Sequence, residues 1–174
     1  IASLLAVAST ATAQSTDLQV YFNDFDGGLD VEPGVNASLG GYLNTQSVRS
    51  YNGIAGPISG SFSGNLLFNG TGNETPPTRA TTLTLTNLPS HDAVSLGFLF
   101  AVIDSWDAAQ PDYFDITVDG SRVFRETFEW NAGRVNDQSF PYTEALLLQQ
   151  NRGWRSDYPD SAYDLGDWAG LQNI

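Results

Sequence analysis

VSLGFLFAVI (residues 94–103), YFDITVD (113–119) and SRVFRETFE (121–129) are the three segments that decide the fold. The first is apolar on both faces, which is typical of a central strand buried between two layers. The second alternates, with Phe114, Ile116 and Val118 on one side. Asp119-Gly120, at the junction of the second and third segments, predicts a two-residue hairpin turn.

The rest of the chain also favours strands. In ATTLTLT (residues 80–86), two leucines alternate with threonines, which predicts a half-buried strand. Residues 29–57 are expected to form long loops with one strand at 47–51, and 61–68 is expected to form another strand. Strands at this spacing predict an antiparallel β-sandwich of the jelly-roll or concanavalin-like kind. Only residues 142–150 are rich in helix formers.

Composition restricts the function classes. The chain has 174 residues, 41% of them apolar, which is enough for one folded domain. Its net charge is -13, and all seven basic residues are Arg. Such a surface repels phosphate backbones, so we expect no nucleic-acid partner. It favours divalent cations instead.

The N-terminal residues 1–13 (IASLLAVASTATA) resemble the remnant of a signal peptide. The apolar run ends in Ala11-Thr12-Ala13, and small residues at the outer positions fit signal-peptidase cleavage after Ala13. The run is too short to span a bilayer, so we expect no transmembrane span here. The alternative is a buried helix or strand. The chain has no Cys. Because secreted eukaryotic domains of this size usually carry disulfides, a bacterial, secreted or cell-surface protein is expected, with residues 14–174 as its single domain.

The acidic loop after residue 103 is the strongest candidate site. Asp104 and Asp107 flank Trp106, and Asp112 and Asp115 follow at the start of the next strand. Clustered carboxylates repel one another unless a cation is present, and Ca²⁺ takes 6–8 oxygen ligands. The four aspartates are therefore predicted to bind Ca²⁺. The alternative is a solvated acidic loop, because the spacing is not that of an EF-hand.

A second acidic turn, NDFDGG (residues 23–28), carries Asp24 and Asp26, and Asp30 follows it. These three aspartates are a possible second metal site. They lack the remaining EF-hand ligands, and a solvated turn is the favoured interpretation.

No catalytic residues are predicted. Glu126 and Glu129 form the one close Glu pair, but positions i and i+3 of a strand point to opposite faces, so a surface role is expected for both. His91, the single histidine, is expected to hydrogen-bond within its own turn. Trp106, Trp154 and Trp168 could stack on sugar rings, with core or sheet-edge packing as the alternative.

Residues 88–128 resemble a domain found in exported bacterial proteins. The motif that carries the resemblance is an apolar strand, then D-S-W-D, a short loop and D-Y-F-D-I-T-V-D-G. Several such proteins carry PEP-CTERM sorting tails or belong to large calcium-dependent surface proteins. The family loop often continues with Gly, where this chain has Ala108. The resemblance implies a lectin-like sandwich without catalytic residues, and it implies closing strands beyond Ile174, so that the domain is truncated at the C-terminus.

These observations predict an extracellular binding or structural module, stabilised by Ca²⁺, that acts in adhesion, glycan contact or matrix. Its expected partner is an extracellular glycan or a surface protein. One alternative is a polysaccharide-active enzyme on the same scaffold, since a fold does not fix a function. Another is a subunit of a surface filament or layer that pairs through sheet edges.

Overall fold

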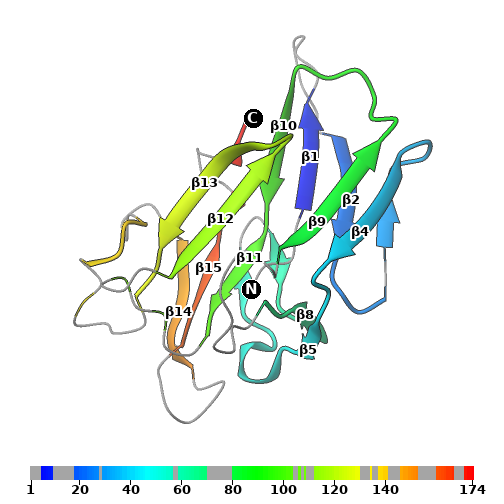
Figure 1. Cartoon of the computed structure of the whole chain (residues 1–174). Coiled ribbons are helices and arrows are strands. Elements are labelled where there is room, and N and C mark those ends of the chain that lie inside the picture. Colours follow the sequence, from blue (N-terminus) through cyan, green and yellow to red (C-terminus); the bar gives the residue numbers. More distant parts are fainter. Residues whose placement is uncertain are drawn as a thin grey trace.

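The structure, a computed structural model, is all-β, with antiparallel sheets in the arrangement of a sandwich (Figure 1). The fold class predicted from the sequence is confirmed. The residues that the structure describes are 5–9, 18–27, 29–56, 59–69, 80–103, 106, 108, 112–129, 134, 137–140, 146–152, 160–166 and 171–174.

Two sheets form the first layer. The four-stranded sheet has the order β10 (Ala93–Gly97), β1 (Leu5–Ser9), β2 (Leu18–Asn23) and β3 (Leu29–Val31). The three-stranded sheet has the order β11 (Leu99–Val102), β15 (Asp160–Asp164) and β14 (Leu146–Arg152). All of these pairings are antiparallel.

Two strand pairs form the second layer, which lies in front in Figure 1. One pair is β12 (Tyr113–Val118) with β13 (Ser121–Thr127). The other is β4 (Asn36–Gly41) with β9 (Thr81–Thr86). The alternation of β9 is as predicted, with its leucines partly buried and Thr82, Thr84 and Thr86 exposed. Asp119 and Gly120 both have positive φ, 50° and 80°, as the predicted hairpin turn requires.

The main core lies between these layers and is rich in aromatic rings. Phe100 stacks on Phe114 at a centroid distance of 4.6 Å, and Phe128 stacks on Phe140 at 4.9 Å. These phenylalanines come from both layers, and Tyr163 of β15 adds its ring to them. Burial of this many large rings is the principal force that holds the layers together.

The predicted single strand over residues 94–103 is two strands, and this expectation was wrong. β10 ends at Gly97 and β11 begins at Leu99, and the two strands belong to different sheets. The Phe98 carbonyl between them accepts a hydrogen bond from Leu165 N at 2.9 Å. A Cβ on Gly97 would lie 3.1 Å from the Cα of Gly166, so this close backbone approach favours glycine at the break.

The two-sided burial predicted for this segment is confirmed in β11. Phe100 and Val102 face the main core, whereas Leu99 and Ala101 face a second core cluster. That cluster is covered by five short elements: β5 (Thr45–Ser47), η1 (Arg49–Tyr51), β6 (Ala55–Gly56), β7 (Gly60–Ser61) and β8 (Asn65–Leu67). The Tyr51 hydroxyl lies 3.4 Å from the carbonyl oxygens of Val102 and Ser161, which links η1 to the sheet.

A buried carboxylate attaches this cover to β15. Asp164 is 4% exposed and accepts hydrogen bonds from Ser59 N at 3.1 Å, Ser59 Oγ at 2.6 Å and Gly166 N at 2.8 Å. A buried charge is tolerated when it is hydrogen-bonded in this way. A Cβ on Gly56 would lie 2.0 Å from the Asp164 carboxylate, so the cover can approach because position 56 has no side chain.

Three sequence predictions differ from the structure. The expected loop over 29–57 contains β3, β4 and β6, and the expected strand at 47–51 contains the 3₁₀ turn η1. Residues 146–150, with their helix formers, belong to β14 instead. β14 pairs with β15 along its length, and this tertiary pairing outweighs local propensity.

The segment predicted to be a signal-peptide remnant contributes β1 to the sheet. Leu5–Ser9 pairs with β10 on one side and with β2 on the other. The predicted cleavage after Ala13 falls outside the described residues and stays a prediction. The predicted truncation after Ile174 stays one as well.

Candidate functional site

The chain passes from β11 to β12 through the predicted acidic loop, and Trp106 anchors that loop in the core. Trp106 is half-buried, and its ring meets Phe100 and Phe128 edge-on, at a centroid distance of 5.9 Å in each case. Such T-shaped pairs are favourable beyond the area they bury. The part of Trp106 engaged with these rings is not available to a sugar, so at most the rest of it can contact a ligand.

Glu129 fixes a second point of the same loop through a hydrogen bond. It follows β13, is 2% exposed, and its Oε2 accepts a hydrogen bond from Ala108 N at 3.2 Å. Its own backbone N–H donates to Gln138 Oε1 at 3.2 Å, and Gln138 Nε2 donates to Phe140 O at 2.8 Å. The predicted surface role of Glu129 is therefore wrong. The residue lies beyond the end of the strand, where alternation no longer decides which side chain is buried.

The four predicted calcium ligands divide into three groups. Asp104 and Asp107 lie outside the described residues. Asp112 is exposed and directly precedes β12. Asp115 lies on the exposed face of β12, 3.8 Å from Arg122 Nη1 and 3.6 Å from Arg125 Nε. Its carboxylate therefore already has cationic partners.

The exposed face of this hairpin carries a further charge contact. The guanidinium of Arg125 lies 4.0 Å from the centroid of the Tyr113 ring. Within the part of the chain that the structure describes, no group of three or more Asp, Glu, His or Cys side chains could hold a metal ion. The calcium ligand set stays a prediction.

In the second acidic turn, Asp24 accepts a hydrogen bond from within the turn, and Asp26 accepts one from a neighbouring strand. Asp24 Oδ1 accepts from Asp26 N at 2.9 Å, and Asp26 Oδ1 accepts from Asn65 N at 2.5 Å, which joins the turn to β8. Asp30 lies on β3 opposite Phe22. The possible second metal site at Asp24, Asp26 and Asp30 remains a prediction.

The other sequence candidates have local roles where they are described. Glu126 Oε2 accepts a hydrogen bond from Ser139 Oγ at 2.6 Å. His91 Nδ1 lies 2.6 Å from Pro89 O, the local hydrogen bond expected of a turn residue. Trp154 and Trp168 lie outside the described residues.

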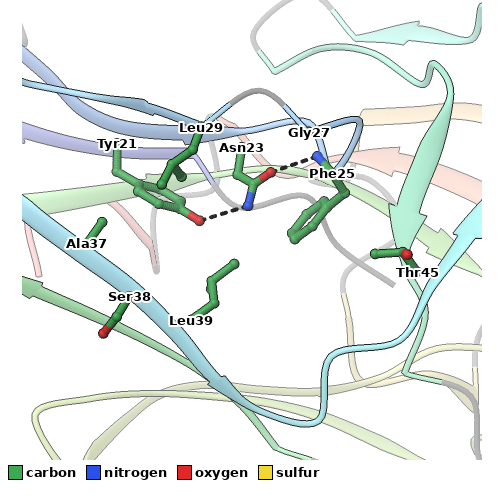
Figure 2. A pocket seen from close by; sticks show the side chains of 9 residues that line it. All are labelled: Tyr21, Asn23, Phe25, Gly27, Leu29, Ala37, Ser38, Leu39 and Thr45. Atoms are coloured by element: carbon green, nitrogen blue, oxygen red, sulfur yellow. Dashed lines mark hydrogen bonds between the residues drawn. The ribbon is translucent and has the colours of Figure 1, made fainter.

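A cavity of about 340 Å³ beside the second acidic turn was not predicted from the sequence. Figure 2 shows the side chains that line it, which come from β2, the following turn, β3, β4 and β5. Asn23 Nδ2 donates to the Tyr21 hydroxyl at 3.1 Å, and Asn23 Oδ1 accepts from Phe25 N at 2.7 Å. The one sequence signal for this arrangement is the NDFDGG turn, since Asn side chains often bond the backbone two residues on.

Tyr21 forms the floor of this cavity. Its side chain is 1% exposed. Burial raises the pKa of its phenol above the usual value of 10.0, and the hydrogen bond from Asn23 opposes part of that rise. The phenol therefore remains protonated, and able to donate a hydrogen bond, throughout the neutral range.

Comparisons of the chain with protein-family models, with curated proteins and with solved structures gave no match. Within the described residues, no helix combines the length and the apolar character that crossing a membrane needs.

Proposed function

We propose that this chain is an extracellular binding module whose contact surface is the loop between β11 and β12, and that Ca²⁺ stabilises this loop. Its partner is an extracellular glycan or a surface protein. One observation carries the proposal: the buried Glu129 carboxylate and the core contacts of the Trp106 ring fix the middle of this loop, and the charged residues of the loop are all aspartates.

A fixed acidic loop is suited to a cation for an electrostatic reason. Asp107 lies in the chain between Trp106 and Ala108, and both of these neighbours are anchored. Holding like charges near one another raises the free energy of the folded chain unless a cation offsets it. Ca²⁺ accepts carboxylate, carbonyl and water oxygens in flexible geometry, so it suits a loop of this composition.

Asp104, Asp107 and Asp112 are the proposed ligands. Asp115 is the least suited of the four candidates, because a cation would compete with its ion pairs to Arg122 and Arg125. These pairs are exposed and individually weak, so they do not forbid a role for Asp115.

Binding is favoured over catalysis by the surroundings of the two glutamates. A glycosidase needs two carboxyl groups that flank a sugar, about 5–10 Å apart. Glu129 is 2% exposed and bonded to Ala108 N, and Glu126 is bonded to Ser139. The polysaccharide-active enzyme therefore remains the second candidate. The third candidate is a subunit of a surface filament or layer, and concentration-dependent assembly in solution would support it.

The test is retention of the chain on a panel of immobilised neutral polysaccharides and surface-protein extracts, in millimolar Ca²⁺ and in chelator. The variants are Asp104→Asn with Asp107→Asn, and Asp119→Asn as the control. The control removes a carboxylate from the β12–β13 turn, where Asn tolerates the positive φ.

We expect wild type and control to be retained in Ca²⁺, and the amount of the double variant that is retained to be at least ten-fold lower. Retention that is independent of both Ca²⁺ and the two aspartates would contradict the proposal, as would the absence of any retention. Release of reducing sugar during incubation would favour the enzyme instead.

A further inference from the structure

We propose that the cavity between β2, β3 and β4 binds the acetamido group and adjoining ring of an N-acetylated amino sugar in a neutral glycan. This rests on the proposed function, because it names the class of glycan and a second place where it is bound. The cavity volume of about 340 Å³ is at the lower end of ligand sites, which range over about 300–1,000 Å³.

Most of the wall is apolar. Leu29, Ala37 and Leu39 contribute aliphatic surface, and Phe25 contributes an aromatic ring. Figure 2 shows the Leu39 side chain directed towards the Tyr21 hydroxyl and the Phe25 ring. A methyl group and the C–H face of a sugar ring match such walls, since aromatic faces grip apolar ring surfaces.

The polar groups at the floor are donors held in place. The phenol oxygen of Tyr21 is the acceptor in its bond with Asn23 Nδ2, so its own proton remains to be donated. Asn23 cannot turn freely, because Oδ1 holds Phe25 N while Nδ2 holds Tyr21. The second amide proton of Asn23 and the Tyr21 proton both remain to be donated to polar groups of a ligand, and preorganised donors increase affinity.

The charge of the surroundings selects a neutral ligand. Asp24, Asp26 and Asp30 belong to the turn and strand beside the cavity, and the chain as a whole carries a net charge of -13. Uronic acids and sulfated sugars would be repelled at this place. A carbonyl with an adjoining methyl group, the acetamido group, satisfies the donors and the apolar walls together without adding charge.

The backbone at Phe25 supports a binding role. Its φ is 62°, in the left-handed region that a bulky side chain seldom adopts, and the hydrogen bond from Phe25 N to Asn23 Oδ1 holds it there. This conformation places the Phe25 ring at the cavity wall. Backbone strain of this kind is concentrated at functional sites.

The experiment is an NMR titration of the ¹⁵N- and ¹³C-labelled chain with N-acetylglucosamine and, separately, with glucose, which lacks the acetamido group. Tyr21→Phe removes the hydroxyl alone, and Tyr113→Phe is the control on the exposed face of β12. Ala37→Leu fills the cavity with aliphatic volume and serves if Tyr21→Phe does not fold.

We expect N-acetylglucosamine to shift the resonances of Phe25 and Leu39, and glucose to bind at least ten-fold more weakly. Tyr21→Phe should weaken binding about ten-fold and Ala37→Leu should abolish it, with no change in the control. Equal binding of both sugars, or full binding by Tyr21→Phe and Ala37→Leu, would overturn the inference. Sugar shifts confined to residues 106–112 would overturn it too but leave the proposed function standing, whereas loss of all glycan and protein retention would end the proposed function itself.

Discussion

Glu129 Oε2 accepts a hydrogen bond from Ala108 N at 3.2 Å, and through this bond a buried carboxylate at the end of β13 holds the loop between β11 and β12. The bond joins residues 21 positions apart in the chain. It makes the shape of the acidic loop depend on the core beneath it, and it leads to the first prediction.

Replacement of Glu129 should loosen the loop. Glu129→Ala removes the acceptor and leaves Ala108 N without it, which should lower the free energy of unfolding by about 1–3 kcal/mol. Glu129→Gln keeps an amide oxygen for the bond and should cost less. Urea denaturation measures both, with Glu126→Ala as the control, since Glu126 bonds to a hydroxyl near the surface. Equal stability of Glu129→Ala and wild type would show that the bond does not hold the loop.

Position 64 requires glycine, because the Asp26 carboxylate occupies the space that a side chain there would need. The φ of Gly64 is 52°, and a Cβ there would lie 2.0 Å from the Asp26 carboxylate. Gly64→Ala should therefore destabilise the chain by more than Gly53→Ala, which also has positive φ but open space around it. Adding Asp26→Ala to Gly64→Ala should recover part of the loss, because neighbouring substitutions are not additive. Thermal unfolding of Gly64→Ala, Gly53→Ala, Asp26→Ala and the double variant Asp26→Ala/Gly64→Ala gives the comparison, and strictly additive effects of the two substitutions at 26 and 64 would contradict the contact.

Tyr21 should make the chain less stable at alkaline pH. Its folded pKa is raised by burial, whereas in the unfolded chain it is about 10. The stability that follows from this difference is present below pH 10 and is lost as the pH rises from 10 through the folded pKa. Tyr21→Phe should show a smaller loss over that window, measured as the urea midpoint against pH, with Tyr113→Phe as the reference. Identical slopes for Tyr21→Phe and wild type would contradict the assignment.

Processing after Ala13 predicts a definite N-terminus. Exported protein should begin at Gln14, as N-terminal sequencing or intact mass can determine. Since β1 lies between β2 and β10, the chain that starts at Gln14 should also lose amide protection at Tyr21 and Ser95, which lie opposite Ala6 and Val7 of β1, relative to the chain that starts at Ile1. Exported protein that retains Ile1 would contradict the signal-peptide prediction.

Local pattern was sufficient to predict three of the four strands of the second layer. The alternation of Leu83 and Leu85 and the Asp119-Gly120 turn gave β9 and the β12–β13 hairpin, because one side of each strand is buried and the turn chemistry is explicit. It failed where pairing decided the structure. β4 has neither β-branched nor aromatic residues and exists through its pairing with β9.

The site was predictable only in part, for a similar reason. The loop of aspartates is visible in the sequence, and its neighbourhood in space is not. Glu129 accepts a hydrogen bond from Ala108, 21 positions away, and Leu39 of β4 lines the same cavity as Tyr21 of β2. A sequence pattern fixes which face a side chain takes within one strand, but it does not say which strand lies opposite.

The most direct test of the central claim is thermal unfolding of the chain in chelator and in millimolar Ca²⁺. Binding at 100 times the Kd stabilises the folded state by about 2.7 kcal/mol, which for a chain of this size raises the Tm by about 5–10 °C. We predict this rise for wild type and for Asp119→Asn, and its absence when Asp104→Asn and Asp107→Asn are combined. Superimposable wild-type curves with and without Ca²⁺ would contradict the account.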